Sequence, residues 1–107
     1  MLTASAKRTD QMVPRELRAS TMVIVDLLSP HYEDMLPGSR EALYQRATEQ
    51  QMTMEKLGFR HAIIPAKDFT EGDYVDRLHL SVKGGDKLAT AVAPVVRQMA
   101  VDLGYLR

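Results

Sequence analysis

The sequence predicts an α/β domain in which two parallel strands alternate with two helices, in the order strand, helix, strand, helix. Three observations predict it. The first is a nearly continuous apolar run, "TMVIVDLL" over residues 21–28, which is typical of a strand covered on both faces. The second is a shorter apolar segment, "FRHAIIPA". The third is a helical pattern between these segments and another after them, and this order favours a parallel pair joined by a right-handed crossover.

Residues 1–19 are expected to form an irregular lead-in. The first twelve are mostly small, polar or charged, and they show no usable period. The segment "VPRELRAS" suggests one helical turn that begins at Pro14. The domain itself is therefore expected to span residues 20–107, with the first strand at its start.

The first helix is expected to begin at Ser39 and to end at Gly58. Ser39 suits the N-cap position, and glycine is the residue most often found just past the end of a helix. Apolar residues between them recur at helical spacing. They are Leu43, Ala47, Met54 and Leu57. The second strand follows, around residues 62–64.

The last helix is expected to start after Ser81 and to stop at Gly104. Pro94 lies inside this segment, where proline removes a backbone donor and bends the helix. The apolar side chains again recur at helical spacing. They are Leu88, Val92, Val95, Val96, Met99 and Leu103.

Two parallel strands do not form a sheet that is stable alone in water, because both edges of the pair are exposed. We therefore expect the sheet to be completed by another segment of the polypeptide, by a second copy or by a different subunit. The expected partners are a second copy or a complementing N-terminal segment, bound through the exposed sheet edge.

Composition excludes several classes of function. The 107 residues include 14 basic and 14 acidic side chains and no basic cluster, so nucleic-acid binding is not expected. No apolar run approaches the roughly 18 to 20 residues that span a bilayer, and no secretory signal is visible. We expect no membrane association, and a cytoplasmic location if Met1 is the native start. No cofactor is expected, and the absence of cysteine excludes thiolate chemistry.

An acid and an imidazole, Asp76 and His79, precede the last helix in the segment "YVDRLHLSVKGGDKLA". A histidine that acts as a general base needs a carboxylate on its far nitrogen, which fixes the tautomer and stabilises the imidazolium. The pair follows the second strand, and open parallel sheets place their ligand crevices beyond the carboxyl ends of the strands. The structural alternative is that Asp76 caps a turn and His79 packs against the last helix.

The surrounding segment, "FTEGDYVDRLHLSVKGGDKLATAVAPVV", resembles the final conserved block of the SGNH (GDSL-type) hydrolases. The likeness covers about residues 20–104. It is most specific at Asp76, Leu78, His79, Leu80, Ser81 and Gly84. It implies the C-terminal portion of a three-layer α/β/α sandwich of flavodoxin-like type and an esterase, acyl hydrolase or O-acyltransferase activity on a small ester. Asp76 would then orient His79, and His79 would be the general base for a serine.

The chain departs from the family pattern at the nucleophile and at the oxyanion hole. Gly72 and Asp73 are followed by Tyr74, no Gly-Asp-Ser occurs, and the sequence contains no asparagine to act as an oxyanion donor. Ser81 reads as a helix cap and Ser29 as a turn residue. We therefore expect the chain to hold half of a catalytic site and to be inactive alone. The alternative is a non-catalytic interaction module derived from the same fold.

Other polar residues near the expected crevice are weaker candidates. His31 could contact a substrate but reads as a surface loop residue, and His61 reads as a strand-edge residue. Asp26 lies inside an apolar run, where an unpaired carboxylate would be costly unless it emerged into the crevice. A metal site is not expected, because the spacing of the available carboxylates and imidazole matches no closed site. That set is Asp68, Asp73, Asp76 and His79.

Overall fold

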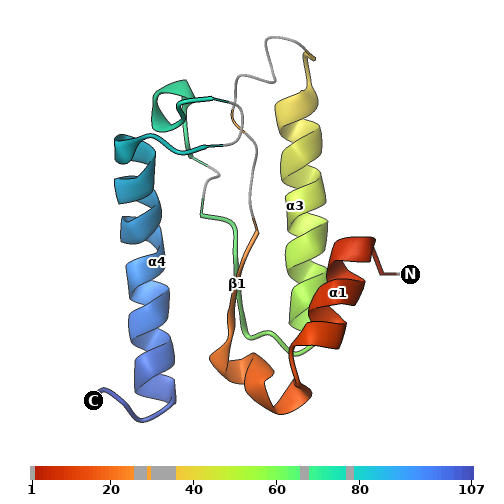
Figure 1. The fold of residues 1–107 in the computed structure, drawn as a ribbon, viewed down its shortest axis with the longest axis vertical. Coiled ribbons are helices and arrows are strands. Elements are labelled where there is room, and N and C mark those ends of the chain that lie inside the picture. The colour runs from red at the N-terminus through yellow and green to blue at the C-terminus, as the bar shows by residue number, and fades with distance from the viewer. Residues whose placement is uncertain (1, 26–28, 30–35, 66–67, 77–78) are drawn as a thin grey trace.

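The computed structural model describes residues 2–25, 29, 36–65, 68–76 and 79–107. The predicted order of strand, helix, strand and helix is present, with additional helical segments before the first strand and before the last helix (Figure 1). The elements are α1 (Ala4–Met12), η1 (Arg15–Ser20, a 3-10 helix), β1 (Met22–Ile24), α3 (Ser39–Lys56), β2 (His61–Ile63), η2 (Glu71–Asp73, a 3-10 helix) and α4 (Val82–Asp102).

The two strands pair in parallel, which confirms the predicted strand–helix–strand unit. Met22 lies opposite His61 and Ile24 opposite Ile63. The ladder continues one residue further, where the Val25 N–H donates to the Ile63 carbonyl oxygen at 2.8 Å. The first strand was expected to be covered on both faces, and this is wrong at Ile24, which is 38% exposed, whereas Val25 is buried.

Helices lie on both sides of the strand pair. In Figure 1, α4 lies on one side of β1, and α3 and α1 lie on the other. The architecture is thus a mixed helix and strand fold with two parallel strands in one sheet, compatible with part of an α/β fold.

Helix α3 ends where the sequence predicts but begins differently at its cap. Gly38, with a φ of 86°, occupies the N-cap position, so the prediction that Ser39 is the cap is wrong. The left-handed conformation explains the glycine, because a Cβ there would be strained. At the other end Gly58 has a φ of 101°, and the Phe59 N–H bonds to the Met54 carbonyl oxygen at 3.1 Å. This is the glycine-terminated end that the sequence predicts.

The core is small and gathers around the C-terminal end of α3. Its fully or nearly fully buried side chains come from α1, α3, β2 and the turn before β2. They are Ala6, Met54, Phe59 and Ala62. The other buried apolar side chains among the described residues, Val25, Ala47, Phe69 and Tyr74, are not members of this cluster. Large apolar side chains such as Met12, Val82 and Tyr105 stay exposed.

The N-terminal segment belongs to this core, so the expectation of an irregular lead-in is wrong for residues 4–12. Thr3 caps α1 by accepting the Ala6 N–H at 3.1 Å. Ala6 is the one buried residue of α1, and a single small side chain leaves no apolar period in the sequence. The predicted turn after Pro14 is confirmed as η1.

A buried arginine joins the N-terminal helices to the end of α3. Arg18 is 3% exposed and donates to the carbonyl oxygens of Val13 at 3.1 Å, Asp10 at 2.8 Å and Leu57 at 2.6 Å. It also pairs with the Asp10 carboxylate at 2.8 Å, and its guanidinium lies 5.3 Å from the centre of the Phe59 ring. These contacts satisfy a charge that would be costly to bury alone.

Helix α4 has the predicted start and stop, but it is poorly covered. Gly104, with a φ of 84°, ends it, and Pro94 lies inside it. Gly84 is its one buried residue, and apolar positions of the predicted stripe such as Val96 and Leu103 are 49% and 46% exposed. Across the described part of the chain, none of the helices combines the length and apolarity needed to cross a membrane.

Candidate functional site

The structure brings Asp76 and His79 together in a short loop between η2 and α4. An antiparallel bridge between Tyr74 and Leu80 closes the loop, and the Val75 N–H donates to the His79 carbonyl oxygen at 2.9 Å. Residues 77 and 78, which include Leu78 of the family-like segment, lie outside the described residues. The Tyr74–Leu80 bridge and the Val75 hydrogen bond hold the two ends of the loop together, which limits how far Asp76 can move from His79.

The Asp76 carboxylate contacts His79 at two points. Its Oδ1 accepts the His79 backbone N–H at 2.7 Å, and the His79 Nδ1 lies 2.8 Å from Oδ2 and 3.0 Å from Oδ1. An ionised carboxylate can only accept hydrogen bonds, so Nδ1 must carry a proton. When the imidazole is neutral, its Nε2 therefore holds the lone pair, which is the state that a general base requires.

Both side chains of this pair lie at the surface. His79 is 73% exposed and Asp76 is 54% exposed at the side chain. The structural alternative is therefore right for Asp76, which caps the turn, and wrong for His79, which does not pack into the start of α4. An exposed ion pair adds little to stability. The contact mainly determines the orientation and tautomer of the ring.

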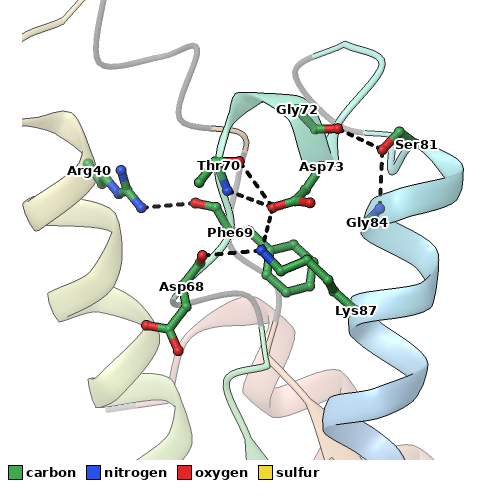
Figure 2. Close-up of polar contacts among 9 residues, drawn as sticks. All are labelled: Arg40, Asp68, Phe69, Thr70, Gly72, Asp73, Ser81, Gly84 and Lys87. Atoms are coloured by element: carbon green, nitrogen blue, oxygen red, sulfur yellow. Dashed lines mark hydrogen bonds and ion pairs between the residues drawn. The ribbon is translucent and has the colours of Figure 1, made fainter.

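The residue at the base of the loop, Asp73, is fully buried. Its Oδ2 accepts hydrogen bonds from the Thr70 N–H at 2.8 Å, the Thr70 hydroxyl at 3.3 Å and the Lys87 ammonium at 2.7 Å (Figure 2). Lys87 comes from the second turn of α4, so this carboxylate connects the loop to that helix. The other oxygen, Oδ1, is buried and has no hydrogen-bond partner among the described residues.

These donors keep Asp73 ionised. The hydrogen bond from Lys87 is the largest cause that lowers the pKa of Asp73, followed by the backbone hydrogen bond from Thr70. Burial acts in the opposite direction, because it disfavours the charged form, but the pKa stays below its ordinary value of 3.8. Asp73 is thus a structural anion and not a proton carrier near neutral pH.

Aromatic and cationic side chains complete the support beneath the loop. The Lys87 ammonium lies 4.9 Å from the centre of the Phe69 ring, and Phe69 meets Tyr74 edge to face with ring centres 6.2 Å apart. Arg40 of α3 donates to the Phe69 carbonyl oxygen at 2.9 Å. Residues 68–74 are therefore held from both sides, by α3 and by α4 (Figure 2).

The first turn of α4 packs directly on η2, which confirms Ser81 as the cap of the last helix. The Ser81 hydroxyl accepts the Gly84 N–H at 3.1 Å and donates to the Gly72 carbonyl oxygen at 2.9 Å. The Ser81 N–H bonds to the Asp73 carbonyl oxygen at 2.9 Å. A Cβ at position 84 would overlap that same carbonyl oxygen, so only glycine permits this approach.

The remaining candidate residues do not join the pair. Ser29 is 1% exposed, and the Ser81 hydroxyl is used in capping, so neither is placed as a nucleophile. His61 lies in β2, where its Nε2 is 3.9 Å from the Asp102 carboxylate of α4. The predictions for Asp26 and His31 fall outside the described residues.

The described residues contain no group of three or more acidic, histidine or cysteine side chains that could hold a metal ion. Two of the carboxylates named above as possible metal ligands have other partners: Asp73 pairs with Lys87, and Asp76 pairs with His79. What the arrangement can do chemically is accept a proton at the His79 Nε2 while Asp76 stabilises the resulting imidazolium.

Sequence reasoning missed the supporting role of Asp73. The spacing Thr70-x-x-Asp73 is that of a capping box, and the structure shows both of its reciprocal hydrogen bonds. Because this spacing is visible in the sequence, the capping box could have been predicted. The contribution of Lys87 could not, because it lies 14 positions further along and its position depends on how α4 packs.

Comparisons with known proteins add nothing to this geometry. The chain matches no protein-family model, no curated protein sequence and no solved structure. The resemblance to SGNH hydrolases stays a prediction from the residues of the loop and its flanks.

We expect Gly84→Ala to destabilise the protein by about 1–3 kcal/mol, because the added methyl group forces η2 away from α4. The matched control is Gly85→Ala, where a Cβ meets nothing within 4 Å. This control should be neutral, or more stable by up to about 1 kcal/mol, since alanine favours the helix. Urea unfolding of both variants measures the difference, and equal stabilities would contradict the close packing described.

Asp73→Asn should change how stability depends on pH. A carboxyl group whose pKa is lower in the folded state than in the unfolded state stabilises the fold at pH values above its unfolded-state pKa. This stabilisation is lost as the pH falls through the folded-state pKa. Wild type should therefore be more stable than the variant at neutral pH, and the gap should close as the pH falls below 3.8. Thermal unfolding across this range measures it, with Asp86→Asn on the exposed face of α4 as control. Parallel pH profiles for wild type and Asp73→Asn would contradict the proposed role.

Proposed function

We propose that this chain supplies the acid and the base of a Ser-His-Asp acyl-transfer site, as the C-terminal portion of an SGNH-like serine hydrolase domain. One observation carries the proposal. The Asp76 carboxylate lies 2.8 Å from the His79 Nδ1 while the ring is 73% exposed at the surface. A histidine whose Nδ1 is held by a carboxylate and whose Nε2 is accessible has the geometry of a general base.

In the proposed reaction, the His79 Nε2 takes the proton of a serine hydroxyl as the serine oxygen attacks the carbonyl carbon of an ester. Asp76 stabilises the imidazolium through Nδ1–H. The imidazolium then returns the proton to the leaving alkoxide as the carbon–oxygen bond of the ester breaks, and an acyl-enzyme forms. Water, activated by the same Nε2, attacks the acyl carbonyl, and the proton that His79 takes from it passes to the serine oxygen as the carboxylic acid leaves.

The nucleophile and the oxyanion donors would come from polypeptide outside this chain. Ser81 caps α4 and Ser29 is buried, and no asparagine is present in the sequence. The position of the loop supports such an arrangement, because it follows the carboxyl end of β2, where parallel sheets form their crevices. In this proposal the two strands belong to a larger three-layer α/β/α sandwich, and the chain alone is inactive.

A second candidate function is that of a non-catalytic interaction module. The observation that favours it is the outer edge of β1, which no strand of the described residues covers and where Ile24 is 38% exposed. Under this alternative, substitutions on that edge would abolish the biological activity and changes to Asp76 and His79 would not.

The test uses the protein tagged in its own source and isolated under native conditions, so that any complementing polypeptide is retained. We expect this preparation to hydrolyse a short-chain nitrophenyl ester, and Asp76→Asn to lower kcat by about 10⁴-fold through the wrong imidazole tautomer. His79→Gln should lower it at least as far. His61→Gln, which changes the histidine of β2, is the matched control and should leave the rate unchanged.

The recombinant chain alone should resist a fluorophosphonate probe, which labels activated serines. Labelling of a serine in the isolated chain would show that the nucleophile is present after all. A native preparation without ester hydrolysis, or one in which His79→Gln has no effect, would refute the enzymatic proposal and favour the interaction module.

A further inference from the structure

The protein has the shape of a slab, and the sheet that its described residues form has two strands. Its extents are 44 × 35 × 18 Å, and Figure 1 looks down the shortest of these axes. Because α4 and α3 lie to either side of the strands in that view, further strands would pair along the short axis. The shortest dimension of the protein is therefore the direction in which additional strands would be added to the sheet.

This thinness leaves much surface exposed. The accessible surface is 7406 Å², whereas a compact monomer of 12.0 kDa exposes about 6,000 Å². The radius of gyration is 15.1 Å, against about 13 Å for a compact domain of this length. A standard interface buries about 800 Å² on each partner. The excess of roughly 1,400 Å² is thus more than one such interface would cover.

The two edges of the sheet differ. Successive peptide groups in a strand point to opposite edges, and Ile63 faces β1 because its carbonyl oxygen accepts the Val25 N–H. The backbone of Ala62 therefore points to the outer edge of β2, where the Gln51 amide donates to its carbonyl oxygen at 2.8 Å. A side chain thus blocks the outer edge of β2, which is a common protection against strand pairing.

Among the described residues, no strand pairs with the outer edge of β1, and a groove runs along it. By the same alternation, the N–H and C=O of Ile24 point away from β2. The groove has a volume of about 510 Å³ and lies between β1, α1 and α3. Val23, Val25 and Met54 contribute to its apolar floor, and Arg46 is the one charged residue among its described lining.

We propose that the β1 edge is the interface between two copies of this chain. A two-fold axis across the strands would pair β1 with β1 of the second copy in antiparallel fashion and form a four-stranded sheet with both Gln51-capped edges outside. Stacking two slabs along the 18 Å axis yields an assembly of nearly equal dimensions. The net charge of zero opposes this association less than a charged surface would.

The oligomeric state of the purified chain tests this proposal, and ester hydrolysis plays no part in the test. Light scattering after size exclusion should show a mass twice the 12.0 kDa of one chain, which falls towards one chain on dilution. Ile24→Lys places a charge at the edge and should leave a single chain of unchanged circular dichroism. Val96→Lys is the matched control, since Val96 is exposed on α4, and it should form a dimer as wild type does.

Hydrogen exchange supplies a readout that needs no variant. The Ile24 amide should be protected at high protein concentration and exposed on dilution. A monomer at every concentration would overturn the proposal and leave the β1 edge to a strand of another polypeptide. A dimer that Ile24→Lys does not weaken, or that Val96→Lys abolishes, would overturn it as well, because the interface would then lie elsewhere.

Discussion

The contact between the buried Asp73 carboxylate and the partly exposed Lys87 ammonium is the interaction on which the candidate site depends. It joins the loop that carries Asp76 and His79 to α4, at a point where the two backbones approach closely enough to require Gly84. A carboxylate buried in this way is tolerated because Lys87 and the Thr70 backbone hold its charge. The exposed Asp76–His79 pair contributes little to stability itself. Its position depends on the contact of Asp73 with Lys87 at the base of the loop.

The second constraint is the shortage of partners for the sheet. Two parallel strands bury one face against α1 and α3, and Arg18 joins these helices at the end of α3. The opposite face, at Ile24, and most of α4 stay exposed. Among the described residues, the two-stranded sheet is left with an outer edge of β1 that no further strand covers. The two proposals for this chain, half of a hydrolase site and one half of a dimer, each supply a partner for the β1 edge. Because that edge can pair with one strand only, the dimer is the state of the isolated chain, and the hydrolase site requires a complementing polypeptide in place of the second copy.

Much of the fold could be predicted from the sequence, because the decisive signals are local. Glycines at 58 and 104 end the two long helices, Ser81 caps the last one, and the apolar runs mark both strands. Helix α1 could not be found by periodicity, since it buries only Ala6. The spacing of Asp76 and His79 predicts their contact, because three residues of loop allow it. The Lys87 anchor and the Gln51 cap could not be predicted, since both depend on how helices pack against distant backbone.

The most direct test of the account is the tautomer of His79, read from nitrogen chemical shifts at a pH where the imidazole is neutral. Wild type should carry its proton on Nδ1 and leave Nε2 free. In Asp76→Asn, the amide oxygen should keep the His79 N–H and the amide nitrogen should face Nδ1, which moves the proton to Nε2. His61 provides the internal control and should not change. A wild-type His79 protonated on Nε2, or a tautomer that Asp76→Asn leaves unchanged, would contradict the claim that Asp76 prepares His79 as a base.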